Sequence, residues 1–236
     1  MNAKIYQLVR TTLNSMLSQS VTPNTVLDDL EWCPEQKSQF ETSMETELSV
    51  PVTAQGTVEQ LVDHLGREYL RRSFGQEWTH AMDSYQQTGW GMIDRVNTLN
   101  PSRVLDVGCG FNLFRGRIAN LIGLDPYNSA ADIQLDIIDY DAEPESFDVI
   151  LALGSLCYNS ESEVEQRFAH CVNLLRPGGR FWLRVNPHVF FQRRPYIDFF
   201  AWSIEVAKLW AQRYNLCLDA WEPDALGRYY LAYTRL

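Results

Sequence analysis

The sequence predicts an α/β fold with a largely parallel sheet, preceded by a small all-α domain. Three observations predict it. The first 70 or so residues carry three amphipathic helical patterns. Val104–Asn112 has the pattern of a short buried strand that runs into a glycine turn. The last 21 residues contain two alternating segments, which are typical of a closing antiparallel pair. We therefore expect a helical domain over 1–70 and an α/β domain over 75–236.

Composition narrows the class of protein. The net charge of -10 argues against a polynucleotide substrate, because nucleic-acid binders normally carry a basic face. No apolar run approaches the roughly 20 residues that span a membrane, and the N-terminus does not resemble a signal peptide. The five cysteines show neither pairing nor metal-ligand spacing. They predict reduced thiols, a cytoplasmic location and no metal site.

Three helices are expected in the first domain. Residues 3–18 place six apolar side chains on one helical face. Pro34 is suited to the first turn of a second helix, which Val50-Pro51 ends. Thr57 and Gln60 have capping-box spacing at the start of a third. Such helices would form a small bundle.

Short connections characterise the middle of the chain. We expect a connector over Gly66–Gly75 and a helix over Gln76–Val96 that breaks at Gly89–Gly91. Asp125 and Asp136 are too close in sequence for a full helix between them, so one face of the sheet would be thinly covered. Since a bare apolar face is costly in water, we expect the N-terminal helices or a second subunit to cover it.

The last third of the chain is more regular. Ser160–Glu163 is a capping box for a helix that Pro177–Gly179 ends before a strand at 180–185. Residues 196–214 are apolar almost all round and predict a buried helix. Residues 216–221 and 229–234 predict the antiparallel pair.

These segments together resemble the class I S-adenosylmethionine-dependent methyltransferases. Motif I is Val104–Asn112, and the segments that follow in the same order are Leu121–Asp125, Leu135–Ile137, Phe147–Gly154 and Leu174–Phe181. The resemblance implies a Rossmann-like, seven-stranded, mostly parallel sheet with an antiparallel terminal strand. It also implies transfer of a methyl group from S-adenosylmethionine to a small molecule or a protein.

The resemblance assigns cofactor contacts to positions that follow the strands. Asp125 would accept two hydrogen bonds from the ribose, although an Asx turn before Pro126 is an alternative role. Asp106 would orient the cofactor or cap the turn. Asn112 replaces the third glycine of the motif and can adopt positive φ. The expected cofactor residues are Asp106, Gly108, Cys109, Gly110, Asp125, Pro126, Asp136, Ile137, Leu153 and Gly154.

The acceptor is expected beyond the carboxyl ends of the fourth and fifth strands. His188 is the first candidate for a general base because imidazole titrates near neutrality, and Tyr158 is the second. Both can also be structural. An anionic acceptor would suit an arginine clamp, and aromatic residues before motif I would form a lid. The substrate candidates are Tyr85, Trp90, Arg184, Arg193 and Arg194.

Two other functions stay open. A nicotinamide-dinucleotide (NAD) oxidoreductase would need a helix that opens at the pyrophosphate. A non-catalytic module could bind S-adenosylmethionine without turnover, or could have lost that binding as well. A homodimer is also left open.

The helical domain has a resemblance of its own. Val26–Leu30 and Met44–Leu48 resemble segments of acyl carrier proteins around the second helix. That resemblance would place the prosthetic-group serine at Pro34, which has no hydroxyl, so phosphopantetheine is not expected there. A helical cap over the α/β domain is the alternative.

Overall fold

The computed structural model describes most of the chain, and its described residues are 2–17, 19–76, 89–185, 195–224 and 227–236. They form two compact units. One contains the described residues up to 76 together with 195–198, and the other contains 89–185 and the described residues from 199 onward. Whether 1–70 and 75–236 are separate domains stays a prediction, as does the carrier-protein resemblance.

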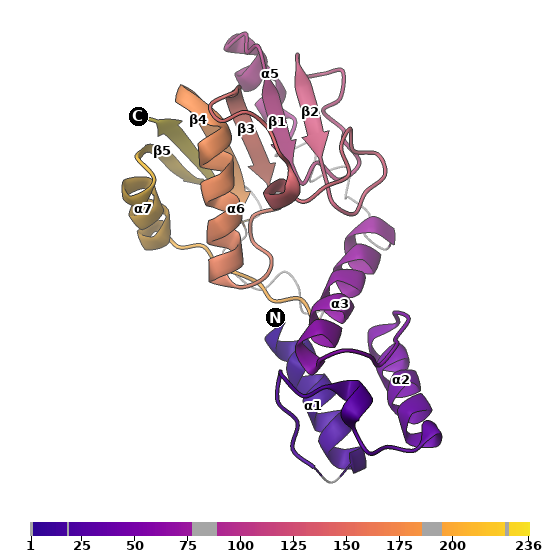
Figure 1. Ribbon diagram of the computed structural model, residues 1–236. Helices are drawn as coiled ribbons and strands as arrows, with labels where there is room; N and C mark the ends of the chain where they lie inside the picture. The colour runs from indigo at the N-terminus through magenta and orange to yellow at the C-terminus, as the bar shows by residue number, and fades with distance from the viewer. Residues whose placement is uncertain (1, 18, 77–88, 186–194, 225–226) are drawn as a thin grey trace. The chain divides into compact units, whose positions relative to one another are not determined.

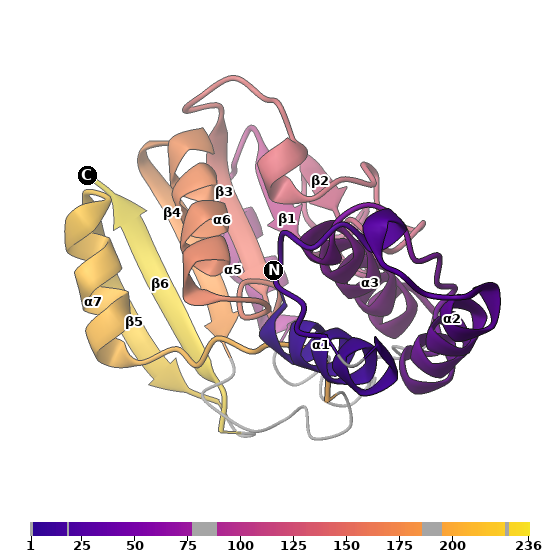
Figure 2. The same ribbon diagram turned by 60° about the horizontal axis from the view of Figure 1, so that its bottom comes forward.

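The first unit is built from helices. Its elements are α1 (Ala3–Leu17), the 3-10 turn η1 (Leu27–Asp29), α2 (Pro34–Leu48), α3 (Val58–Arg71) and the π-helical turn η2 (Arg72–Gln76). α1 contacts both α2 and α3 (Figure 2). Pro34 begins α2, and the Thr57 hydroxyl accepts a hydrogen bond from Gln60 N at 3.2 Å at the start of α3. Both helices therefore begin where the sequence pattern places them, and α3 extends through part of the expected connector to Arg71.

Residues 195–198, which we call the strap, belong to this helical unit although they follow it by more than 100 residues. The backbone carbonyls of Tyr196 and Ile197 accept hydrogen bonds from the Asn2 and Lys4 side chains at 2.8 and 2.9 Å. The Tyr196 hydroxyl donates to Glu47 of α2, and its ring meets Tyr69 of α3 edge-on. Ile197 is 2% exposed. The strap thus contacts all three helices and completes the core of the unit.

The second unit is built around a sheet of six strands among the described residues, so the expectation of seven is wrong (Figure 1). The order is β2-β1-β3-β4-β6-β5. The first four of these run parallel, and β6 pairs antiparallel with both β4 and β5. The bounds are β1 (Val104–Val107), β2 (Leu121–Leu124), β3 (Phe147–Leu153), β4 (Leu175–Val185), β5 (Leu216–Pro223) and β6 (Tyr229–Arg235).

A single β-bridge stands where another parallel strand could have followed β2. Ile133 makes one parallel bridge to Leu124. The Asp132 side chain then accepts hydrogen bonds from Gly123 N at 2.8 Å and from Asn112 Nδ2 at 3.0 Å. These side-chain bonds add to the backbone bonds that Asp132 and Ile133 make with Gly123 and Asp125 at this edge. The prediction that no full helix fits between Asp125 and Asp136 is confirmed.

Helices lie on both faces of the sheet. α6 (Glu161–Leu174) and α7 (Ile204–Arg213) pack on one face (Figure 1), around Phe168, whose ring meets those of Phe181 and Trp210. α5 (Gly91–Thr98) packs on the opposite face against Val104, Val149 and Leu151. Whether the N-terminal helices or a second subunit cover part of the sheet stays a prediction.

The predicted helix over 196–214 is wrong over its first part. α7 begins only at Ile204, where the Ser203 hydroxyl accepts a hydrogen bond from Val206 N. The apolar residues before it have other partners: Ile197 is buried in the helical unit, and Phe199 forms a β-bridge with Tyr158. The apolar residues of this segment therefore do not form one helical face, because they pack in two different units. None of the described helices is long and apolar enough to cross a membrane.

Candidate active site

The turn after β1 has the backbone conformation that its glycines allow. Gly108, Gly110 and Asn112 have φ of 71°, 55° and 53°. The prediction that Asn112 adopts positive φ is confirmed. A Cβ atom at Gly108 would lie 2.2 Å from Cβ of Ser155, so any side chain there would clash. Ser155 also donates a hydrogen bond to the Val107 carbonyl. Sequence reasoning missed Ser155, because only the parallel pairing of β1 with β3 brings it to this turn.

Asp125 follows β2 and holds this turn in place. Its Oδ2 accepts a hydrogen bond from Gly110 N at 3.0 Å. Its Oδ1 accepts from the backbone N–H groups of Tyr127 and Asn128, both at 2.8 Å. The Asx-turn geometry is therefore present. A carboxylate offers about four lone-pair positions, so about one is left for a ligand hydroxyl in this arrangement.

Asp106 lies beneath the turn, on β1, and is 2% exposed. Its Oδ2 is buried and has no hydrogen-bond partner among the described residues. Burial, together with the nearby Asp125 carboxylate, raises the pKa of Asp106 to about 7, against a lowering effect of Arg184. A buried acceptor without a partner is costly. A donor from a bound ligand would relieve that cost.

The structure gives four other expected cofactor residues surroundings within the protein itself. Asp136 caps the 3-10 turn η3 (Ile137–Asp139) and forms an ion pair with Arg167 of α6 at 2.9 Å. Ile137 is buried in the main core. Burial is the main cause of the raised pKa of the Cys109 thiol, which therefore stays protonated. Pro126 begins the loop that the Asp125 side chain organises.

The carboxyl ends of β3 and β4 bring together Leu153, Gly154 and Arg184. Arg184 Nη2 donates to the Leu153 carbonyl at 2.8 Å, and Gly154 has φ of 105°. Tyr158 lies four residues further on, with its ring edge-on to Phe199 at 6.2 Å. The structure thus places Arg184 beside the turn that follows β3, as the acceptor prediction requires.

Other candidates are placed differently or lie outside the described residues. Tyr85, His188, Arg193 and Arg194 lie outside. Trp90 precedes α5, packs against the core on that face, and has the Arg117 guanidinium 4.3 Å from its ring. This position fits a structural role in the core. The role of Trp90 in a lid stays a prediction.

Arg228 and Tyr230 also lie near this edge, and sequence reasoning did not single them out. Tyr230 is the register partner of Arg184, and Arg228 is two residues before it. The alternation over 229–234 indicated which side chains share a face. It could not indicate that this strand lies next to β4.

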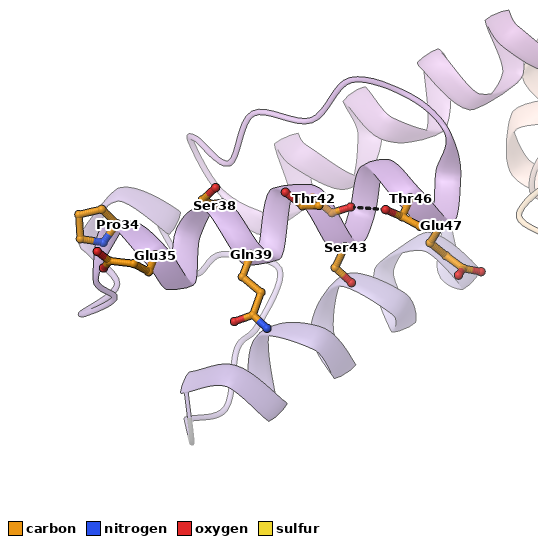
Figure 3. A pocket seen from close by; sticks show the side chains of 8 residues that line it. All are labelled: Pro34, Glu35, Ser38, Gln39, Thr42, Ser43, Thr46 and Glu47. Carbon is orange, nitrogen blue, oxygen red and sulfur yellow. Dashed lines mark hydrogen bonds between the residues drawn. The ribbon is translucent and has the colours of Figure 1, made fainter.

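A groove of about 800 Å³ runs along α2 in the helical unit (Figure 3). Hydroxyl, amide and carboxylate groups line it, and the Thr46 hydroxyl donates to the Thr42 carbonyl at 2.7 Å. Its residues are Pro34, Glu35, Ser38, Gln39, Thr42, Ser43, Thr46 and Glu47. They include neither histidine nor cysteine, so we place no chemistry there.

Comparison with known families identifies the second unit. A family described as a methyltransferase domain matches residues 105–183. Residues 105–183 therefore carry a methyltransferase domain. The match extends from β1 into β4 and includes the glycine turn, Asp125 and Gly154. The predicted resemblance, and S-adenosylmethionine as the cofactor of that class, are confirmed.

Solved structures share the fold of this methyltransferase domain. A protein from Pyrococcus horikoshii OT3 is 15% identical, with a TM-score of 0.55 over 70% of this chain and 96% of that one. The 1,6-didemethyltoxoflavin-N1-methyltransferase of Burkholderia thailandensis, with substrate and S-adenosylhomocysteine bound, is 15% identical, with a TM-score of 0.53 over 79% and 92%. The N-methyltransferase NodS of Bradyrhizobium japonicum, with S-adenosylhomocysteine bound, is also 15% identical, with a TM-score of 0.51 over 83% and 97%. No curated protein matches the sequence.

Proposed function

We propose that this chain is an enzyme that transfers a methyl group from S-adenosylmethionine to a small-molecule or protein acceptor. The observation that carries the proposal is a turn with two glycines beside an unpartnered buried carboxyl. Gly108 and Gly110 let a ligand approach the backbone, and Asp106 Oδ2 offers an acceptor to the cofactor's cationic amino group. Asp125 would accept one ribose hydroxyl.

The bound cofactor would supply an electrophilic methyl group on a sulfonium. The residues of this chain would hold the acceptor in line with that methyl, about 3 Å away, and exclude water. The Leu153–Gly154 turn and Arg184 lie where the acceptor would approach. His188 and Tyr158 stay the candidates for removing a proton from it.

One observation supports the non-catalytic alternative. The Asp125 carboxylate already holds three backbone N–H groups, and Ser155 packs directly on Gly108. Binding of the cofactor would therefore require Ser155 to shift. The dinucleotide alternative has less support, because residues 111–120 form turns and offer a pyrophosphate no helix N-terminus.

Calorimetry on the full chain tests the proposal. We expect wild type to bind S-adenosylhomocysteine and not NAD, and Asp125→Asn to weaken that binding about tenfold, which corresponds to one hydrogen bond to a charged group. Asparagine keeps a carbonyl oxygen for Tyr127 and Asn128, whereas alanine would leave three N–H groups without an acceptor. The exposed Asp141→Asn is the control.

Turnover decides between the enzyme and the binding module. Release of S-adenosylhomocysteine during incubation with an acceptor library would support the enzyme. Binding without turnover on any acceptor would favour the module, and binding of NAD alone would overturn both.

A further inference from the structure

Three side chains on one face of the sheet point to the chemistry of the acceptor. In the antiparallel register of β4 and β6, Arg184 is opposite Tyr230. Arg228 is two residues before Tyr230, in the turn that precedes the start of β6 at Tyr229, so it is diagonal to Arg184 at the end of this strand pair. Such diagonal neighbours are about 7–8 Å apart at Cα, within reach of long side chains. Arg184, Tyr230 and Arg228 therefore gather at the carboxyl end of β4.

The Tyr230 hydroxyl is buried and has no hydrogen-bond partner among the described residues. Leaving such a group without a partner is costly. Its neighbour Tyr229 faces the other way and stacks on Trp221 with ring centroids 4.6 Å apart. The two adjacent tyrosines therefore differ in what surrounds them, and only Tyr230 lies on the face of the arginines.

Arg228 is held in a fixed position by the β5–β6 hairpin. Its Nε donates to Asp224 Oδ2 at 2.7 Å, its backbone N donates to Asp224 Oδ1 at 2.9 Å, and its side chain is 13% exposed. Burial lowers the pKa of Arg228, and the charge of Arg184 lowers it further, which indicates that the two guanidinium groups lie close together.

The three groups share a hydrogen-bonding character. Guanidinium groups are donors without acceptor capacity, and a phenol provides a donor O–H. The complementary ligand group is an anionic oxygen pair, which matches the fork of donors on an arginine. Arg184 also donates to the Leu153 carbonyl, next to Gly154, so this donor cluster continues into the proposed acceptor site.

We propose that Arg184, Arg228 and Tyr230 form a subsite that binds an anionic oxygen group of the methyl acceptor, either a carboxylate or a phosphate. This inference rests on the proposed function, since it names the substrate class of that site. Arg184 was already a candidate for such a clamp. Arg228 and Tyr230 are assigned here as specificity-determining residues.

Ligand-observed NMR on the full chain saturated with S-adenosylhomocysteine tests the subsite. The probes are benzoate, phenyl phosphate and the neutral benzamide, chosen because Trp182 and Tyr230 supply aromatic surface on this face. We expect wild type to bind benzoate or phenyl phosphate, and whichever binds more tightly identifies the anion. Equal binding of benzamide, or no binding of either anion, would overturn the inference.

Matched variants locate the binding. Tyr230→Phe should weaken anion binding about tenfold, because a hydrogen bond to a charged group is lost. Tyr229→Phe removes a hydroxyl from the adjacent residue on the other face and should change nothing. Arg228→Lys should weaken binding, whereas Arg180→Lys, at the far end of the same face of β4, should not. If the single variants Tyr230→Phe and Arg228→Lys both bound the anion with wild-type affinity, the assignment would be contradicted.

Two measurements keep this inference separate from the proposed function. Absence of S-adenosylhomocysteine binding by wild type would defeat the proposed function. Normal binding of that nucleoside without any preference for anions would defeat the subsite alone. The wild-type comparison of benzoate with benzamide holds even where a variant fails to fold.

Discussion

The charged form of Asp106 destabilises the folded protein, because this side chain is buried on β1 near the carboxylate of Asp125. The pKa of Asp106 is about 7 in the folded protein and near 3.8 in the unfolded chain. Between these two values the folded state binds a proton that the unfolded state has released. The contribution of Asp106 to stability therefore falls as the pH rises from about 4 to about 7.

The variant Asp106→Asn tests this, since the amide resembles the protonated acid in having no charge. We expect it to raise the free energy of unfolding at pH 8 by a few kcal/mol, at about 1.4 kcal/mol for each unit of pKa shift, and by much less at pH 5. Urea unfolding at both pH values measures the difference. The same variant should lose affinity for S-adenosylhomocysteine if Asp106 accepts a bond from it.

Asp141→Asn serves as the control, because this carboxylate is exposed. If Asp106→Asn changed stability equally at pH 5 and pH 8, burial of a charge would not be the cause.

Single residues also show what sequence reasoning can reach at this site. The positive φ of Asn112 was predictable, because asparagine tolerates it and the motif requires it. The Asx-turn bonds of Asp125 to Tyr127 and Asn128 were foreseen only as an alternative to ribose binding, and its bond from Gly110 was not foreseen. Both roles use the same carboxylate, and the pattern of residues does not rank them.

The strap is an element whose contribution to stability can be measured. Ile197 is 2% exposed within the helical unit. Ile197→Ala should lower the free energy of unfolding of that unit by about 2–5 kcal/mol, because it leaves a cavity. Hydrogen exchange should then show faster exchange of amides in α1 and α3.

Phe199→Ala is the matched change two residues later, in the methyltransferase unit. It should leave α1 and α3 unaffected and instead increase exchange near its bridge partner Tyr158. If both variants affected the same amides, the division of the chain between Asp198 and Phe199 would be wrong.

Elements with local signals were predictable, and elements fixed by distant partners were not. The capping box of Ser160 and Glu163 begins α6 where expected, with Ser160 Oγ accepting from Glu163 N. The strand that would follow β2 is reduced to the bridge at Ile133, beside which the Asp132 side chain accepts a hydrogen bond from Gly123 N. The segment before α7 looked helical because its residues are apolar, although they are buried in two separate units.

At the scale of the whole molecule, the methyltransferase class of the α/β unit could be predicted from sequence motifs, because the order of these motifs along the chain could be checked. The motifs lie at the ends of β1, β2 and β3, and parallel pairing brings those ends to one edge. The acceptor side could not be reached in the same way. The residues proposed for it come from β4, from β6 and from the turn before β6, and the antiparallel register that brings them together leaves no motif in the sequence.

The strap also determines how this polypeptide would behave if it were cleaved. A protease site engineered between residues 77 and 88 would sever the peptide link before β1, yet residues 195–198 would still lie among α1, α2 and α3. We expect the two fragments to co-elute in gel filtration and to separate once Asn2→Ala and Tyr196→Ala are introduced. The gene could thus be expressed as two halves that reassemble.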